Sequence, residues 1–168
     1  MKRYCFDTSG FSNPHETMPE DIPIYGPLWR CMITLVESAA IATTTELYKE
    51  MCHITGDFGA CLNSNKSSLV LEVDNPDWDA LTYVRHYVRM QREHRAFISE
   101  YSQMGSKKTI CLADLTGIAM AKTLRLPLVS SESSTQDSPT KKRIPDICDL
   151  EKVPHLTFNQ FLKAEGVS

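Results

Sequence analysis

Short apolar runs alternate along the chain with longer stretches in which apolar residues recur every three or four positions. Leu28, Met32 and Leu35 have this helical spacing. We therefore expect a helix that starts near Leu28 and ends near Ser38. The short runs are typical of strands buried in a parallel sheet, and they cover residues 3–6, 40–42, 126–129 and 156–158. The alternation predicts an α/β sandwich with a mostly parallel sheet. A further run at residues 69–71 fits a strand or a helix equally.

Turn-forming and capping residues indicate where other helices begin. Residues 7–14 are rich in Gly, Ser, Asn, Asp and Pro, and we expect a turn there. Thr43 and Glu46 have the spacing of a capping box, which predicts a helix that breaks at Gly56 or Gly59. Further helices are expected to begin at residues 75–77, Asp114, Pro145 and Asn159. Residues 133–143 hold few apolar side chains, so we expect a flexible loop.

The composition suits one globular domain. The 168 residues are 42% hydrophobic and 23% charged, with a formal net charge of -3. No apolar run approaches the roughly 20 residues needed to cross a bilayer, and the first residues lack the apolar core of a signal peptide. The six cysteines form no C-x-x-C pair, so we expect reduced thiols in a cytoplasmic protein.

Acidic residues stand close to the ends of the expected strands. They are Asp7 after the first run, Glu50 in the helix after the second, Asp114 after residues 110–113, and Glu132 three residues past Val129. The carboxyl ends of parallel strands meet at one edge, where such sheets hold their working residues. Carboxylates gathered there need a counter-charge, and oxygen ligands suit Mg²⁺ or Mn²⁺. Ions held in this way serve phosphodiester chemistry.

Each acid also has a purely structural interpretation. Asp7 fits an Asx-turn, Asp114 fits a helix N-cap, and Glu132 fits a solvated loop. The capping box explains Glu46 and offers no role for Glu50, which is otherwise an ordinary exposed Glu of a helix. The repeated position after strands is what favours a shared site.

Other chemistries lack their signatures. The five histidines show no zinc-hydrolase spacing, and the chain contains neither a P-loop nor a G-x-S-x-G motif. Two basic clusters occur, one within residues 85–95 and one at Lys141, Lys142 and Arg143. Either cluster is a candidate for contacts with RNA phosphates or is an ordinary solvated surface.

Four segments resemble, in order, the motifs of PIN (PilT N-terminal) domains: residues 4–9, 41–51, 112–121 and 126–132. Residues 6–12 and 142–148 are similar to segments of a bacterial PIN-like subfamily. The resemblance implies a three-layer α/β/α sandwich. It also implies a Mg²⁺- or Mn²⁺-dependent endoribonuclease, commonly the toxin of a type II toxin–antitoxin pair.

The resemblance assigns roles to the acids and their neighbours. It places the metal on Asp7, Glu50 and Asp114, with Glu132 completing the site directly or through water. Thr8 or Ser9 would orient a carboxylate or contact a phosphate. The implied substrate is RNA, and the candidate partners are an antitoxin protein and a second copy of the chain.

Two departures from the PIN pattern leave an alternative open. Glu132 stands where most PIN nucleases have Asp, and Ser9 stands where many have Asn. With the negative net charge, Glu132 favours a non-catalytic PIN-like module that binds RNA or protein; the intact Asp7, Glu50 and Asp114 favour the enzyme. A phosphatase of the haloacid dehalogenase type is set aside, because Ser9 replaces the second Asp of its Asp-x-Asp motif.

Overall fold

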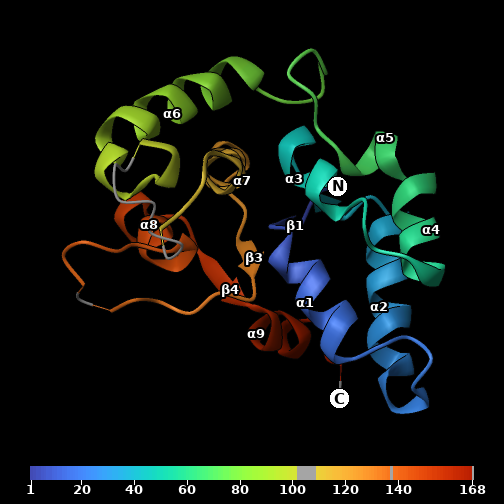
Figure 1. Cartoon of the computed structure of the whole chain (residues 1–168). Coiled ribbons are helices and arrows are strands. Elements are labelled where there is room, and N and C mark those ends of the chain that lie inside the picture. The colour runs from blue at the N-terminus through green and yellow to red at the C-terminus, as the bar shows by residue number, and fades with distance from the viewer. Residues whose placement is uncertain (102–108, 137, 168) are drawn as a thin grey trace.

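The computed structural model describes residues 1–101, 109–136 and 138–167 (Figure 1). A parallel sheet with the strand order β2-β1-β3-β4 forms its centre. The strands are β1 (Tyr4–Phe6), β2 (Ile41–Ala42), β3 (Leu128–Ser130) and β4 (His155–Thr157). All four lie within a residue or two of the apolar runs, which confirms the predicted strands.

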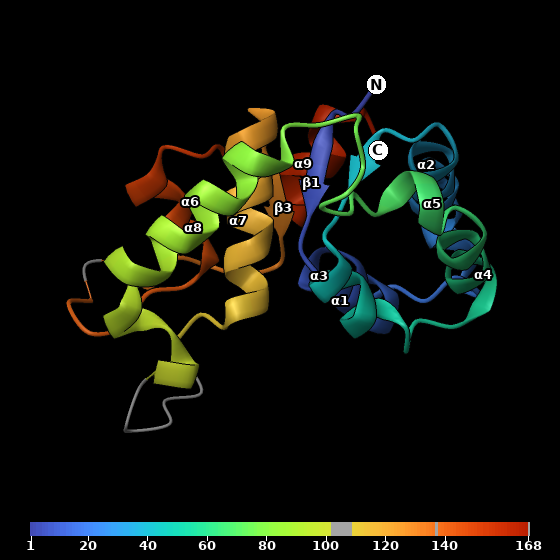
Figure 2. The same cartoon turned by 90° about the horizontal axis from the view of Figure 1, so that it is seen from above.

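Helices cover both faces of the sheet and make a three-layer α/β/α sandwich. They are α1 (Ser9–Thr17), η1 (Pro23–Tyr25), α2 (Gly26–Glu37), α3 (Thr45–Met51), α4 (Gly56–Ser64), α5 (Lys66–Leu69), α6 (Ala80–Glu93), η2 (Arg95–Phe97), η3 (Ser99–Tyr101), α7 (Leu112–Leu124), α8 (Ile144–Glu151) and α9 (Phe158–Ala164). Figure 2 shows α6, α7 and α8 on one side of the strands, and α2, α4 and α5 on the other. The α/β fold class predicted from the sequence is confirmed.

Two hydrophobic cores lie on opposite faces of the sheet. Side chains alternate along a strand, so Tyr4 and Phe6 enter one core and Cys5 enters the other. Val129 and Leu128 of β3 divide between the cores in the same way. Because both faces are covered, β1 and β2 are apolar throughout rather than alternating with polar residues, whereas the edge strand β4 carries His155 and Thr157.

The turn expected at residues 7–14 is wrong: most of this segment belongs to α1. Phe11 is fully buried and stacks on Phe6, with the ring centroids 4.5 Å apart. The backbone N–H groups of Phe11 and Ser12 both donate to the carbonyl oxygen of Thr8. Burial of the Phe11 ring therefore outweighs the local preference of this segment for a turn.

Two helix starts differ from their prediction by one or two residues. The expected capping box at Thr43 is wrong, because Thr44 is the N-cap and its Oγ1 accepts a hydrogen bond from Leu47 N at 3.3 Å. Thr43 Oγ1 instead donates to the buried Phe6 carbonyl at 3.1 Å. Thr157, not Asn159, caps α9.

The structure also shows where the helix expected to break at Gly56 or Gly59 ends, and which structure residues 69–71 adopt. The helix after β2 ends at Met51, and Gly56 begins a new helix, α4, with a φ of 77°. Within residues 69–71, Leu69 ends α5 and Val70 forms a parallel bridge to Thr43, so the run is part helix and part extended. The long helix expected from residues 75–77 starts later, after the cap Asp79.

The described residues of 133–143 contain no helix or strand, and Pro145 lies in the first turn of α8 as expected. Among the residues that the structure describes, none of the helices combines the length and the apolar character needed to cross a membrane.

Candidate functional site

The carboxyl ends of all four parallel strands point to one edge of the sheet, and a polar network joins two of them there. Asp7 directly follows the inner strand β1, and its backbone N–H donates to the Val129 carbonyl of β3 at 3.0 Å. Ser131, one residue past β3, donates from its N–H to Ser9 Oγ at 3.1 Å and from its Oγ to the Ser9 carbonyl at 2.7 Å. Ser9 thus ties the segments after β1 and β3 together.

Asp7 is a buried carboxylate held by its own turn. It is 4% exposed, and its Oδ2 accepts hydrogen bonds from Ser9 N at 2.9 Å and from Ser9 Oγ at 2.6 Å. Burial raises the pKa of Asp7, the two Ser9 hydrogen bonds oppose that rise, and the nearby charge of Glu132 adds to it. The predicted orienting role of Ser9 matches this geometry.

Asp114 reaches the same region from the first turn of α7. The apolar run before it is not a strand of the central sheet, because Ile110 forms only an isolated bridge to Ile98. Asp114 is also not the N-cap: Cys111 is, and Asp114 stands three residues on, where its Oδ2 accepts from Cys111 N at 2.8 Å. Helix α7 packs against β1 and β3, which carries its first turn to the sheet edge.

Electrostatics link Asp114 to the other acids. Burial raises the pKa of Asp114 to about 7, and the charges of Asp7 and then Glu132 push it in the same direction. Within the described ranges, none of the ion pairs supplies a cation to Asp7, Asp114 or Glu132. Three carboxyl groups therefore share one partly buried region without a positive partner from the chain.

Glu132 connects this region to the start of α8. Its Oε2 accepts a hydrogen bond from Ile144 N at 3.0 Å, and its own N–H donates to Ser130 Oγ at 3.2 Å. Glu132 also borders an open hollow of about 500 Å³ between α1, the end of β3 and α9. Glu132 therefore contacts the start of α8 and also lines an open hollow.

Glu50 lies on the exposed side of the same edge. Thr8 Oγ1 donates to Glu50 Oε2 at 3.0 Å, and Thr8 directly follows Asp7. The Glu50 charge also raises the pKa of the Cys111 thiol, after burial and the charge of Asp114. The Glu46 charge acts on a different neighbour, Tyr83 of α6. Burial raises the pKa of Tyr83, and the Glu46 charge adds to that rise.

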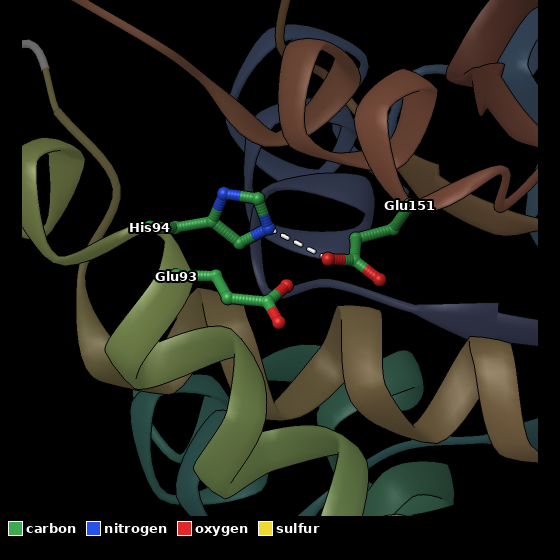
Figure 3. Close-up of side chains that lie close together, drawn as sticks. All are labelled: Glu93, His94 and Glu151. Atoms are coloured by element: carbon green, nitrogen blue, oxygen red, sulfur yellow. Dashed lines mark hydrogen bonds and ion pairs between the residues drawn. The ribbon is translucent and has the colours of Figure 1, made fainter.

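The four predicted acids lie at the same edge of the sheet, but their carboxylate oxygens do not form a compact set of metal ligands. Among the described residues, the group of three acidic, His or Cys side chains whose ligand atoms lie within 4.8 Å of one another is Glu93, His94 and Glu151 (Figure 3). No three of Asp7, Glu50, Asp114 and Glu132 meet that limit.

The group in Figure 3 is an ion-pair network, which the sequence did not predict. His94 Nε2 lies 2.6 Å from Glu151 Oε1. Arg89 contacts both carboxylate oxygens of Glu151 at 3.1 and 2.6 Å and reaches Glu93 at 2.5 Å, and Lys122 Nζ lies 3.2 Å from Glu151 Oε2. Burial opposes ionisation of Glu151, but hydrogen bonds from Arg89, His94 and Lys122 outweigh it and lower its pKa to about 2.

Two positive side chains already balance the two carboxylates of this network. The Arg89 guanidinium lies between Glu93 and Glu151 and takes the place that a metal ion would need. We therefore interpret the network as a structural ion-pair network that holds α6, α7 and α8 together. Helical spacing predicts the Arg89–Glu93 pair, but Glu151 is 62 residues from Arg89, and no local signal links them.

The basic residues Lys141, Lys142 and Arg143 are half-buried and lead directly into α8. The next residue, Ile144, donates the hydrogen bond to Glu132. Asp146 holds this segment: it accepts from Arg143 N at 2.8 Å and, together with Ser134 and Thr135, pins the preceding loop. The hydrogen bond from Ile144 N–H to the Glu132 carboxylate thus links the predicted basic segment to the acidic region.

Comparison with protein families assigns the chain to one family. The model of the family described as Domain of unknown function (DUF4411) matches residues 4–168. The match spans nearly the whole chain and includes all four acids, so the protein belongs to this family. No curated protein matches it.

Proposed function

We propose that this protein is a PIN-type ribonuclease that requires Mg²⁺ or Mn²⁺. The observation that carries the proposal is the group of Asp7, Asp114 and Glu132 at the carboxyl edge of a parallel sheet. Burial and mutual repulsion raise the pKa of two of them, and no cation of the described chain neutralises them. Perturbed carboxylates of this kind are common at functional sites.

The donor set fits a divalent cation. Asp7, Asp114 and Glu132 offer oxygen ligands, which Mg²⁺ and Mn²⁺ prefer, and Glu50 stands beside Thr8 to add one from the exposed side. When bound, such an ion activates water and stabilises the leaving oxygen of a phosphodiester. Ser9 holds Asp7 in one orientation, and Cys111 N–H does the same for Asp114. The carboxyl groups of Asp7 and Asp114 must both lose their protons before they can bind the ion.

Two features support RNA as the substrate: a basic segment close to the acids and the resemblance to PIN domains. Lys141, Lys142 and Arg143 lie next to the residue that bonds Glu132, and this position supports contacts between their charges and phosphates near the acids. The resemblance to PIN domains adds RNA as the substrate and a role as the toxin of a toxin–antitoxin pair in the cytoplasm. A homodimer is part of the same proposal.

Two measurements on the whole chain test this proposal. We expect Mn²⁺ to bind the wild type in calorimetry, and Asp7→Asn to lose most of that affinity. We also expect total RNA to be cleaved with Mg²⁺ or Mn²⁺, but not in EDTA or by Asp7→Asn. Equal Mn²⁺ affinity in both proteins contradicts the shared site. Metal binding without cleavage, together with RNA or protein binding, favours the non-catalytic alternative.

A further inference from the structure

The outward face of α6 carries aliphatic side chains where a surface helix normally carries polar ones. Leu81, Val84 and Val88 are 61%, 37% and 57% exposed, whereas Tyr83 and Met90 face inward and are buried. The three exposed residues are spaced i, i+3 and i+7, so they form one stripe along the helix. Single exposed apolar residues are ordinary, but a stripe with this spacing is typical of a helix that packs against another helix.

Two arginines flank this stripe. Arg85 and Arg92 each follow an exposed aliphatic residue, Leu81 or Val88, by four positions and therefore lie on the same face. Both are exposed, and neither forms an ion pair within the described part of the chain. The basic cluster of this helix thus has two sides: Arg89 turns toward Glu151, and Arg85 and Arg92 face outward.

The stripe has the layout of one side of a coiled coil. Leu81 and Val88 occupy successive a positions, Val84 the d position between them, and Arg85 and Arg92 the e positions, whose charges select partners in coiled coils. Figures 1 and 2 show α6 on the outside of the molecule, and it packs inward against α7. We propose that this face of α6 docks an amphipathic helix of a partner protein, with Asp or Glu beside its apolar stripe.

Charge and side-chain type select this occupant. A second copy packed antiparallel would place the e-position arginines of both helices, Arg85 and Arg92, against each other, which repels. Single-stranded nucleic acid is bound through aromatic side chains on which bases stack, and this stripe has only aliphatic ones. From Leu81 to Arg92 the face is about 16 Å long at the rise of an α-helix, so about three turns of a partner helix would cover it. This proposal is independent of the ribonuclease proposal.

Two synthetic three-heptad peptides provide the probe. Both have Leu at the a and d positions, and they carry either Glu or Lys at e and g. By fluorescence anisotropy with the whole chain, we expect the Glu peptide to bind at least about tenfold more tightly than the Lys peptide, because opposite charges at e and g favour pairing. Leu81→Ser with Val88→Ser should abolish binding, and Arg85→Glu with Arg92→Glu should reverse the preference.

Matched controls come from exposed residues elsewhere. Leu150→Ser on α8 removes a side chain that is 55% exposed, and Arg30→Glu reverses an exposed charge on α2; neither should change binding. Circular dichroism checks that each variant folds. Equal binding of both peptides, no binding of either, or binding that survives Leu81→Ser with Val88→Ser would overturn the proposal. So would dimerisation of the wild type that is lost in that variant, because the face would then be filled by a second copy.

Discussion

Ser9 Oγ donates a 2.6 Å hydrogen bond to Asp7 Oδ2 and at the same time accepts one from Ser131 N at 3.1 Å. The hydroxyl therefore fixes the carboxylate after β1 and joins it to the segment after β3. We expect Ser9→Ala to raise the pKa of Asp7 further and to weaken Mn²⁺ binding about tenfold, since a hydrogen bond to a charged group contributes roughly 1.5–3 kcal/mol.

Ser12 on the same helix provides the control. Its Oγ is buried and has no hydrogen-bond partner among the described residues, so Ser12→Ala should leave Mn²⁺ affinity unchanged and should not reduce stability. Calorimetry with Mn²⁺ at pH 7 compares the two variants. An equal loss in both would show that the hydroxyl of Ser9 has no particular role at Asp7.

Asp114→Asn should make the metal-free protein more stable at high pH. The folded protein holds the Asp114 proton up to a pKa of about 7, whereas the unfolded chain releases it near 3.8, so stability falls as the pH rises between these values. Asn stays neutral throughout and can still accept from Cys111 N. The variant should gain about 1–3 kcal/mol over the wild type at pH 8 and little at pH 4.

Urea unfolding in EDTA at the two pH values measures this gain. The same substitution removes a metal ligand, so Mn²⁺ should stabilise the wild type more than Asp114→Asn. A variant that is less stable than the wild type at pH 8 would contradict the raised pKa of Asp114.

Glu50 and Glu46 lie one turn apart on α3 and provide a matched pair. Glu50 accepts from Thr8 beside Asp7, whereas the charge of Glu46 acts on Tyr83. Glu50→Gln keeps an acceptor for Thr8 but loses the charge, so Mn²⁺ affinity should fall about tenfold while folding is retained, a change of about 1.4 kcal/mol. Glu46→Gln should change it less than about twofold. The reverse order would move the site to the α6 side of α3.

The basic segment before α8 should contribute to RNA binding through charge. Replacement of Lys141, Lys142 and Arg143 by Ala should reduce the slope of log affinity against log salt by about 2, since each phosphate contact contributes roughly 0.7 for single strands. Filter binding of single-stranded RNA at several salt concentrations measures the slope. A control with the same loss of charge replaces Arg30, Lys66 and Lys163. Equal slopes in both triple variants would make the segment an ordinary solvated loop.

The strands, and the positions of Asp7 and Glu132 just after two of them, were predictable because both depend on local sequence. A short apolar run that ends in an acid is visible at Phe6–Asp7, and the run at β3 precedes Glu132 in the same way. Asp114 was found for a partly wrong reason, since it reaches the sheet edge through α7 and not through a strand.

The features that were missed depend on contacts between distant residues. Helix α1 forms where turn residues dominate because Phe11 is buried against Phe6, and a propensity argument does not include that burial. The spacing of Thr43 and Glu46 predicts a helix cap, whereas the Thr43 hydroxyl donates to the Phe6 carbonyl of the neighbouring strand. The partner of Arg89 is Glu151, far along the chain, so the sequence alone does not show that the basic cluster on α6 has two sides.

The network around Glu151 should stabilise the fold above acidic pH. Glu151 is 5% exposed and accepts hydrogen bonds from Arg89, His94 and Lys122, which lower its pKa to about 2 from the usual 4.5. Its contribution to stability is therefore complete above pH 4.5 and is lost as the pH falls toward 2.

Glu151→Gln leaves these cations without a counter-charge and should cost about 3 kcal/mol at pH 7, with the difference from wild type shrinking in acid. Glu93→Gln removes a more exposed carboxylate whose ion pair among the described residues is with Arg89, and it should cost less than about 0.5 kcal/mol. Urea unfolding at pH 7 and pH 3 in EDTA measures both variants. Equal losses in the two variants would contradict the central role of Glu151. Stabilisation of the wild type by Zn²⁺ in the absence of EDTA, lost in both Glu93→Gln and Glu151→Gln, would make this cluster a metal site and not an ion-pair network.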